Sequence, residues 1–461
     1  MSKVFIVDPA LKNHHGHHYA VTERFSASLH SDNEVIWLVN KRYQLDTSDK
    51  DREFKIDLVF SEGTYDGYMQ TGMQDGVLWC SDWCADVKQK IISILRKVYR
   101  HSPAFISRKA GYLYNMLRGV VTNLTADSVK EKDKVVPPEQ ELFEALSAQK
   151  CSADDCVIFH TCDAHTYRDV LALFTKVMSI EEWNKFPVFI LSTPYDMRIM
   201  PHNKSDKPAN HSIMHMRILG LLDTRIFLYA ENELLADQLA TDWGVNVSAL
   251  YIPCAGKSLK VSSADDANVL NVVYIGAART EKGFVDIAEV IIRYLKVSDR
   301  RDIRFTVQVT PQIMGYTSDV KLAVEKLSSI DDDRLKLIHD VLSPERYDEV
   351  LLSADVILLF YDKERYAVRS SGIAIEAIEN CKNVIATEGT FPAYMAGNSG
   401  VVVKTANEII HAVDEIADNR ELYRRAAETR RKWVLEKCSA DRMYDVISRG
   451  KMVEIGGSVL D

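Results

Sequence analysis

Short apolar runs of strand length alternate with longer amphipathic segments along most of the chain. In the first half these runs occupy residues 3–7, 34–39, 156–160, 187–191 and 225–229. A second series occupies residues 271–276, 303–309, 334–339, 355–360, 383–387 and 400–403. The segments between them, such as 284–297 and 344–354, have helical periodicity. Apolar strands joined by helices predict parallel sheets covered on both faces, which is a doubly wound α/β fold.

The two series of runs predict two domains, which suits a chain of 461 residues. The pattern breaks at residues 251–270, where a proline, a glycine and a run rich in serine and aspartate intervene. We therefore expect an N-terminal Rossmann-like domain over residues 1–255 and a second one over residues 256–438. Residues 439–461 begin with a serine that suits a helix N-cap and continue with helical spacing. Open sheets of this kind bind ligands at the carboxyl ends of their strands, so two facing sheets would form a binding cleft.

The composition is that of a globular protein able to build a core, with 46% hydrophobic and 27% charged residues. The apolar stretch from Val4 to Val7 is shorter than the centre of a signal peptide, and no run reaches the length that spans a bilayer. The eight cysteines lack Cys-x-x-Cys spacing, which favours reduced thiols. We therefore expect a cytoplasmic protein without a structural zinc site and without a nucleic-acid partner.

One segment departs from the acidic balance of the chain, whose formal net charge is −9. Residues 88–125 hold eight lysines and arginines and no acidic residue, interleaved with Ile, Leu, Phe and Tyr. This basic amphipathic insertion could lie on the anionic inner face of the cell membrane or hold an anionic acceptor such as a lipid-linked sugar. Equally, it could be a helical hairpin that packs on the first domain and leaves its basic face in solvent.

Residues 366–390 contain a candidate anion site. Ser370, Ser371 and Gly372 follow a predicted strand and open a helix, so their backbone N–H groups would face the cleft. Glu376 lies one turn further along the same side of that helix, where a carboxylate could bind the vicinal hydroxyls of a ribose. The alternative is an ordinary capped helix with a surface glutamate.

A second candidate loop carries Gly276, Arg279 and Lys282 directly after a predicted strand. Its two cations would meet phosphates from the other side of the same cleft. The alternative is a solvated turn, but two anion-binding loops in one domain favour a nucleotide site.

Four histidines surround Gly16 in the stretch at residues 14–19. They could form a metal cage, a phosphate-binding turn or a polar loop. Adjacent side chains diverge, and neither a carboxylate nor a cysteine joins them within the loop, so we expect no metal there.

Together these segments resemble glycosyltransferases of the GT-B fold, and most closely the retaining, nucleotide-sugar-dependent enzymes of glycosyltransferase family 4. The resemblance covers nearly the whole chain, including residues 4–39, 272–284 and 371–387. It implies two doubly wound Rossmann-like domains that face each other across a cleft. It also implies that the helix expected within residues 439–461 crosses back to the first domain.

The resemblance assigns roles to residues on the donor side. Lys282 would contact the donor diphosphate and Glu376 the nucleotide ribose, while Gly16 would let the backbone approach the donor or acceptor. The remaining residues that we expect at the donor are Arg279, Arg369, Ser370, Ser371 and Gly372.

On the acceptor side, His17 and His18 would lie at the entrance of the helix that follows Gly16. Residues 156–173 resemble the family's His-x-His-Asp-x-His segment, with matches at His160, Asp163 and His165. The match makes His165 the active-site histidine near the donor sugar and puts Asp163 with the acceptor. Without the resemblance, a lone histidine such as His165 is more often structural.

The sequence departs from the family pattern at two important places. Val368 stands where the family has a second glutamate, which meets hydroxyls of the donor sugar, so recognition of that sugar must differ. The arginine that usually follows Gly276 is Ala277 here, and Arg279 or Arg369 would substitute for it.

These assignments predict an enzyme, a hexosyltransferase that moves a sugar from a nucleotide-diphosphate donor to a hydroxyl of a glycan or lipid-linked acceptor in cell-surface polysaccharide synthesis. Lys282, Arg279 and the helix start would stabilise the charge of the leaving phosphate without a metal or another cofactor. Retention of the anomeric configuration is implied by the resemblance alone. Two alternatives stay open, namely a nucleotide-sugar epimerase of the same fold and a non-catalytic GT-B scaffold protein, the latter suggested by Val368.

Overall fold

The computed structural model describes residues 2–14, 16–46, 49, 52, 54–61, 136–178, 185–195, 207–254, 269–311, 315–439, 442, 443, 445 and 446. Of residues 16, 17, 207 and 208 it describes the backbone alone. The basic insertion predicted at residues 88–125 lies outside the described residues. Most of the predicted interdomain stretch and most of residues 439–461 lie outside them too.

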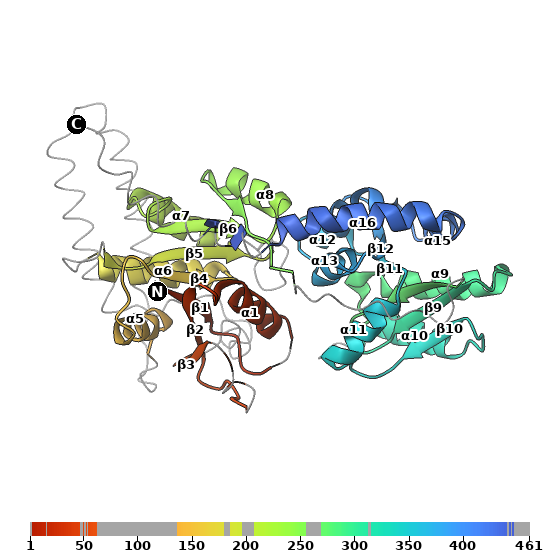
Figure 1. Cartoon of the computed structure of the whole chain (residues 1–461), viewed down its shortest axis with the longest axis horizontal. Helices are drawn as coiled ribbons and strands as arrows, with labels where there is room; N and C mark the ends of the chain where they lie inside the picture. The colour runs from red at the N-terminus through yellow and green to blue at the C-terminus, as the bar shows by residue number, and fades with distance from the viewer. Residues whose placement is uncertain are drawn as a thin grey trace.

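The first domain is built on a seven-stranded parallel sheet with the order β3-β2-β1-β4-β5-β6-β7 (Figure 1). Its strands are β1 (Ser2–Asp8), β2 (Asn33–Asn40), β3 (Lys55–Phe60), β4 (Cys156–Phe159), β5 (Val188–Thr193), β6 (Ile226–Ala230) and β7 (Ser248–Ala249). Its helices are α1 (Gly16–Leu29), α5 (Pro138–Ala148), α6 (Ala164–Val177), α7 (Lys207–Ile218) and α8 (Glu233–Trp243).

Alternation along β1 shows why the sheet is covered on both faces. Phe5 and Val7 pack in one buried cluster with residues of α5, α6, α7 and α8. Val4 and Ile6 point to the opposite face and pack in a second cluster with residues of α1. Because successive side chains of a strand point to opposite faces, a strand that is apolar throughout must have a helix layer on each side.

The second domain has a six-stranded parallel sheet with the order β10-β9-β8-β11-β12-β13. Its strands are β8 (Leu270–Tyr274), β9 (Ile303–Gln308), β10 (Leu335–Ile338), β11 (Val356–Leu359), β12 (Asn383–Thr387) and β13 (Gly400–Val403). The elements that cover it are η4 (Thr280–Lys282), α9 (Phe284–Val297), α10 (Ser318–Ser328), α11 (Pro344–Ser353), α12 (Lys363–Tyr366), α13 (Gly372–Glu379), α14 (Phe391–Ala396), η5 (Gly397–Ser399), α15 (Glu408–Asp418) and α16 (Arg420–Lys437).

The predicted doubly wound α/β architecture is confirmed in both domains. Every apolar run that the sequence analysis selected is a strand, whereas β3 and β7 were not predicted. In both sheets the strand order reverses at the first strand, between β1 and β4 and between β8 and β11. The carboxyl ends of these strand pairs are the expected ligand positions in such sheets.

The chain returns from the second domain to the first after α16, which runs along the second domain toward the first (Figure 1). Met443 and Val446 are buried in the same cluster as residues of β1 and α1. At the end of α16, the ammonium of Lys437 lies 2.6 Å from the carboxylate of Glu233 in α8. Within the described ranges, no helix is both long and apolar enough to cross a bilayer.

Candidate functional site

A buried carboxylate at the carboxyl end of β1 contacts two imidazoles. Asp8 Oδ2 lies 2.9 Å from Nδ1 of His18 in α1 and 3.3 Å from Nε2 of His160, which follows β4. Burial would raise the pKa of Asp8, but the two imidazoles, His18 above all, outweigh it and hold that pKa well below its usual range. Asp8 is therefore an anion that fixes the ring of His18.

His160 joins the strand layer to α1. Its Nε2 lies 2.8 Å from the hydroxyl of Thr22 in α1, and its Nδ1 lies 2.8 Å from the hydroxyl of Thr161. Since His160 is buried and both ring nitrogens have protein partners, it supports the arrangement of Asp8 and α1.

His18 is only partly buried, so part of its side chain is accessible. Burial works to lower its pKa, but Asp8 and, more weakly, Glu231 outweigh this effect and raise the pKa above its ordinary value. Gly16 is the first residue of α1, and the side chain of His17 lies outside the described residues.

Asp163 and His165 lie where α6 begins, just after β4. The Asp163 side chain is the N-cap of α6 and accepts a hydrogen bond of 2.9 Å from the backbone N–H of Thr166. Its other oxygen, Oδ2, is buried and has no hydrogen-bond partner among the described residues. Burial lowers the pKa of His165, against the opposing effect of Asp163, so the ring is neutral near pH 7. The active-site role of His165 stays a prediction.

Another histidine of the opening run has a different environment. His14 contacts Asp46 through Nδ1 at 3.2 Å and Asp49 through Nε2 at 3.0 Å. The two carboxylates approach different ring nitrogens of His14. The imidazole therefore bridges the two aspartates, and the three side chains are not arranged around one common metal position. These three residues are the one set among the described residues whose ligand atoms lie within 4.8 Å of one another.

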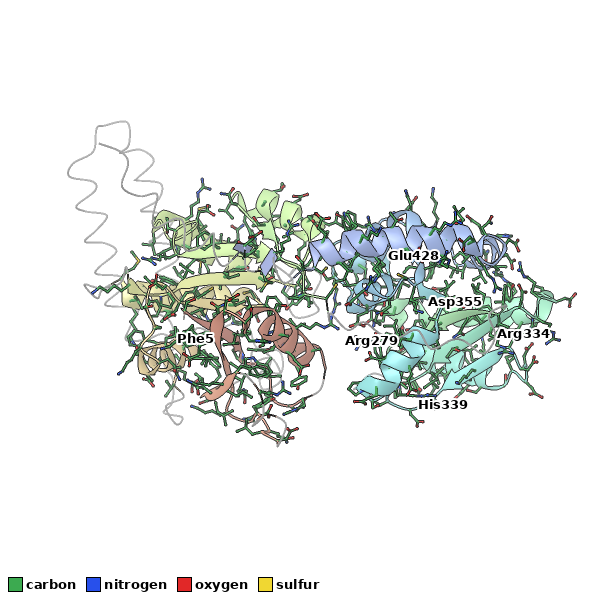
Figure 2. The ribbon with its side chains drawn as sticks, viewed as in Figure 1. Phe5, Arg279, Arg334, His339, Asp355 and Glu428 are labelled. Atoms are coloured by element: carbon green, nitrogen blue, oxygen red, sulfur yellow. The ribbon has the colours of Figure 1, made fainter. Side chains whose placement is uncertain are left out.

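In the second domain, Lys282 is half-buried and lies among other cations. Burial, followed by repulsion from Arg279 and Arg369, lowers the pKa of Lys282 to about 8, while Glu281 works in the opposite direction. The guanidinium of Arg279 lies 3.6 Å from the carboxylate of Glu281. Figure 2 places Arg279 on the side of the second domain that faces the first. Three cations with one nearby carboxylate form a site that favours an anion.

The loop after β8 lies directly against the first turn of α13. A Cβ added to Gly276 would lie 3.1 Å from Cδ1 of Ile373 and 3.4 Å from Nζ of Lys282. Gly276 also has a φ of +109°, which residues with side chains rarely adopt. The structure therefore brings together the two loops that the sequence analysis selected.

Two tyrosines lie beneath these cations. The Lys282 ammonium is 5.6 Å from the centre of the Tyr361 ring, and the guanidinium of Arg369 is 5.4 Å from that of Tyr366. The two rings pack against each other with centroids 4.4 Å apart. Cations over aromatic faces are stabilised without a counter-ion, so the pair can hold Lys282 and Arg369 in place before an anion binds.

The start of α13 is fixed by its own cap and by the first domain. Ser371 is the N-cap, and its hydroxyl accepts a hydrogen bond from the backbone N–H of Ala374. Asn232, which follows β6, donates bonds of 2.9 Å to the carbonyl of Val368 and to the hydroxyl of Ser370. The segment that opens α13 is thus positioned by both domains. A short helix that was not predicted, α12, separates it from β11.

Glu231 lies between the histidine cluster and the cations. Burial raises the pKa of its carboxyl to about 8, against a hydrogen bond from Ser370 and the charges of Arg369 and His18. At neutral pH Glu231 is therefore mostly protonated, a state in which it can donate as well as accept a hydrogen bond. The sequence analysis missed Glu231 and Asp8. The signal that could have found them is a polar residue at the end of a buried strand.

Glu376 is held by residues of both domains. Its Oε1 lies 2.6 Å from Nη2 of Arg24 in α1, and its Oε2 accepts a hydrogen bond of 2.6 Å from the hydroxyl of Tyr347 in α11. The Glu376 side chain is 18% exposed and its carboxylate is paired, so it is not the free surface glutamate of the alternative interpretation. Its contact with a ribose stays a prediction.

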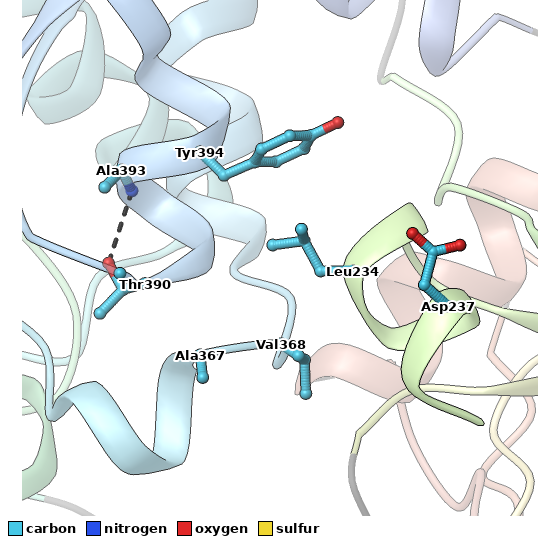
Figure 3. A pocket seen from close by; sticks show the side chains of 8 residues that line it. Leu234, Asp237, Ala367, Val368, Thr390, Ala393 and Tyr394 are labelled. Carbon is cyan, nitrogen blue, oxygen red and sulfur yellow. Dashed lines mark hydrogen bonds between the residues drawn. The ribbon is translucent and has the colours of Figure 1, made fainter. Parts of the chain in front are cut away.

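A mainly apolar pocket of about 510 Å³ lies between the domains, beside the segment before α13. Figure 3 shows Leu234 and Asp237 of α8 across from Ala367 and Val368. Gly389, Thr390, Ala393 and Tyr394 complete its lining. Val368 is therefore shared between this pocket wall and the Asn232 contact.

Solved structures with the same architecture are glycosyltransferases and related proteins. The chain is similar to a glycosyltransferase from Rickettsia africae ESF-5, with a TM-score of 0.57, 13% identity, and coverage of 98% of this chain and 97% of that chain. It is also similar to Alr3699/HepE from Anabaena in complex with UDP and glucose (TM-score 0.57, 8% identity, 100% of both chains). A third similar structure is sucrose-phosphate synthase from Thermosynechococcus elongatus (TM-score 0.55, 11% identity, 99% and 98%).

No protein-family model matches the chain, and no curated protein matches it. The likeness to solved structures spans both domains, and it confirms that the chain has the GT-B fold. Identities this low establish the fold, and the activity has to be argued from the site.

Proposed function

We propose that this protein is a glycosyltransferase that moves a sugar from a nucleotide-diphosphate donor to a hydroxyl of a glycan or lipid-linked acceptor. The observation that carries the proposal is the meeting of Arg279, Lys282 and Arg369 with the start of α13. Helix starts and converging cations favour phosphates. The start of α13 also lies at the switch point of a doubly wound sheet, where such folds bind ligands. The similar Anabaena protein, which was solved with UDP and glucose, supports the same class of donor.

In this reaction the bond from the anomeric carbon to the diphosphate oxygen breaks, a bond from the acceptor oxygen to that carbon forms, and the proton of the acceptor hydroxyl passes to the leaving diphosphate. The leaving diphosphate gains negative charge, which Arg279, Lys282 and the N–H groups at the start of α13 would stabilise. Burial and two guanidinium groups disfavour the charge on Lys282, so an incoming diphosphate would relieve that penalty. The proposal includes neither a metal ion nor another cofactor.

On the opposite side of the cleft, His18 would contact the acceptor hydroxyl, since Asp8 fixes its ring through Nδ1. His17 and Asp163 complete the proposed acceptor side, and His165 is the proposed histidine near the donor sugar. Retention of the anomeric configuration rests on the resemblance to family 4. The anomeric proton coupling in the NMR spectrum of the product would distinguish retention from inversion.

We further propose that the acceptor belongs to cell-surface polysaccharide synthesis and that residues 88–125 contact the anionic inner face of the membrane. The argument for contact is the segregation of basic residues in a chain of net charge −9. At low salt, the native protein should sediment together with vesicles of phosphatidylglycerol. A chain in which the eight basic residues are replaced by glutamine should stay in the supernatant.

The test of the donor site is thermal unfolding in the presence of a panel of nucleotide sugars. A true donor raises the unfolding temperature by mass action, and Lys282→Ala should abolish the shift. Lys321→Ala is the matched control, because Lys321 is an exposed lysine of α10. A donor that binds should then be consumed only with an acceptor. Conversion without an acceptor would favour the epimerase, and intact cellular glycan synthesis in Lys282→Ala would favour the scaffold.

A further inference from the structure

Both oxygens of the Glu376 carboxylate accept a hydrogen bond from a separate element of the fold. Arg24 reaches across from α1 of the first domain, and Tyr347 comes from α11 of the second, each at 2.6 Å. The side chains of Arg24 and Glu376 are only 20% and 18% exposed, so water screens this ion pair weakly. Charge-assisted hydrogen bonds of this length are among the strong ones.

These contacts leave the Glu376 carboxylate able to accept further hydrogen bonds from a ligand. A carboxylate has about four lone-pair positions, and one donor on each oxygen occupies two of them. The two donors also fix the rotation of the carboxylate, so its remaining lone pairs point in defined directions. A pair of vicinal hydroxyls could use them without displacing either donor.

The protonation states of the two donors make the arrangement durable. Burial works against the charge of Arg24, but Glu376 outweighs it and raises the pKa of the guanidinium above its ordinary value. Burial, and then the charge of Glu376, raises the pKa of Tyr347 well above its ordinary value, so its hydroxyl keeps its proton. Glu376 therefore has two permanent hydrogen-bond donors.

Arg24 also belongs to the helix that holds His18 and Thr22, both of which contact the Asp8 and His160 cluster. A displacement of α1 would therefore disturb the contacts of Glu376 together with those of His18.

We propose that Arg24 is a positioning residue for the donor nucleotide: with Tyr347 it orients Glu376 to accept the ribose hydroxyls, so the nucleoside half of the donor site is complete only with α1 of the first domain. The proposal rests on the proposed function, because it takes the ligand of Glu376 to be a nucleotide. It adds a residue of the opposite domain to that site.

The experiment compares two probes, UDP and inorganic pyrophosphate, by isothermal titration calorimetry. Pyrophosphate lacks the ribose, so only UDP binding should depend on Arg24. We expect Arg24→Ala to weaken UDP binding about tenfold and to leave pyrophosphate binding within about twofold, as the loss of one charged hydrogen bond implies. Arg24→Lys should recover part of the loss.

Two further variants separate positioning from a structural effect. Tyr347→Phe keeps the ring and removes the hydroxyl, and should weaken UDP binding alone. In a Glu376→Gln background, Arg24→Ala should add little further loss, because the residue through which it acts is already altered. Arg346→Ala is the matched control, since Arg346 is an exposed arginine of α11 that pairs with Glu349.

Three results would overturn the proposal while leaving the proposed function standing. They are unchanged UDP affinity in Arg24→Ala, tighter UDP binding, which would make Arg24 a competitor of the ribose, and equal weakening of both probes. If the native protein bound neither UDP nor pyrophosphate, the proposed function would fail and this inference with it.

Discussion

Asp8 at the end of β1 and His18 in the first turn of α1 form a hydrogen-bonded pair, with 2.9 Å between the carboxylate Oδ2 and the imidazole Nδ1. The same carboxylate lies 3.3 Å from His160, so one buried anion organises two rings at the carboxyl ends of β1 and β4. The position of Asp8 at the end of an apolar run could have pointed to it, but its two histidine partners could not be deduced from the sequence. The pair fixes the ring of His18, the histidine that we propose for the acceptor side.

Asp8→Asn should therefore impair sugar transfer. The amide cannot hold His18 as the carboxylate does, and the pKa of His18 should fall once its largest stabilising charge is gone. We expect the transfer rate to drop on the order of a hundredfold, as for the loss of an oriented acid or base. Steady-state rates across pH would measure both effects.

A second buried aspartate serves as its control. The Asp155 side chain accepts hydrogen bonds from the backbone N–H groups of Lys3 and Ser152, each at 2.7 Å. Among the described residues, no histidine is hydrogen-bonded to it. Asp155→Asn should lower stability but leave the turnover of the folded enzyme nearly unchanged. Equal loss of turnover in both variants would refute the special role of Asp8.

Glu231 should make stability depend on pH. Its pKa of about 8 exceeds the ordinary value of 4.5, so the folded protein holds a proton there that the unfolded chain has lost. This contribution to stability is full below about pH 4.5 and is lost as the pH rises to about 8. The unfolding temperature of Glu231→Gln should thus fall less between pH 5 and 8 than that of the native protein, by several degrees.

Glu233→Gln is the matched control for that measurement. Burial would raise the pKa of Glu233, but hydrogen bonds from Lys437 and Tyr251 outweigh it and lower the pKa. Its contribution is therefore present above its ordinary pKa and is lost only in acid. Between pH 5 and 8 the curves of Glu233→Gln and the native protein should run parallel, and a parallel course for Glu231→Gln would contradict the assignment.

Binding of UDP should draw a proton onto Lys282. The pKa of this lysine is lowered to about 8 by burial and by Arg279 and Arg369, and a diphosphate beside it should restore the charged form. Calorimetry at a pH near 8.5 in buffers of different ionisation enthalpy should reveal uptake of a fraction of a proton per UDP. Lys282→Arg, which stays charged, should bind UDP without uptake; undiminished uptake in that variant would show that another group titrates.

Gly283, which follows Lys282, should tolerate no side chain. A Cβ there would lie 1.8 Å from the carbonyl oxygen of Phe360, and the φ of +68° is itself unfavourable for other residues. Gly283→Ala should therefore cost several kcal/mol of unfolding free energy, about 3 or more, whereas strain alone costs about 1. Urea denaturation of the native protein and of Gly283→Ala would measure this loss of unfolding free energy.

Gly315→Ala isolates the strain contribution. Gly315 has a φ of +84° and no neighbouring atom within 4 Å of the added Cβ. Similar losses in the two variants would mean that the close approach of Gly283 to Phe360 relaxes easily.

The strands were predictable because burial on both faces leaves a direct mark in the sequence. All selected runs are strands, including every strand of the second sheet. β3 was missed because it lies at the edge of its sheet and is largely exposed or half-buried, so it mixes Lys55 and Asp57 with apolar residues. β7 has only two residues, which is too short for any periodicity to register.

The second-domain loops were predictable because helix caps and strand-to-loop transitions are local. The contacts of Glu376 and Glu231 were not, since they depend on how the two domains meet. Arg24 and Glu376 are separated by 352 positions, and no local pattern relates them. Asn232 likewise reaches Val368 only because the end of β6 faces the segment before α13.

The most direct test is a structure determined with UDP bound. We predict that the diphosphate lies between the first turn of α13 and the side chains of Arg279 and Lys282, with the ribose hydroxyls on the Glu376 carboxylate. UDP bound elsewhere on the chain, or a diphosphate that touches neither Lys282 nor the start of α13, would contradict the account.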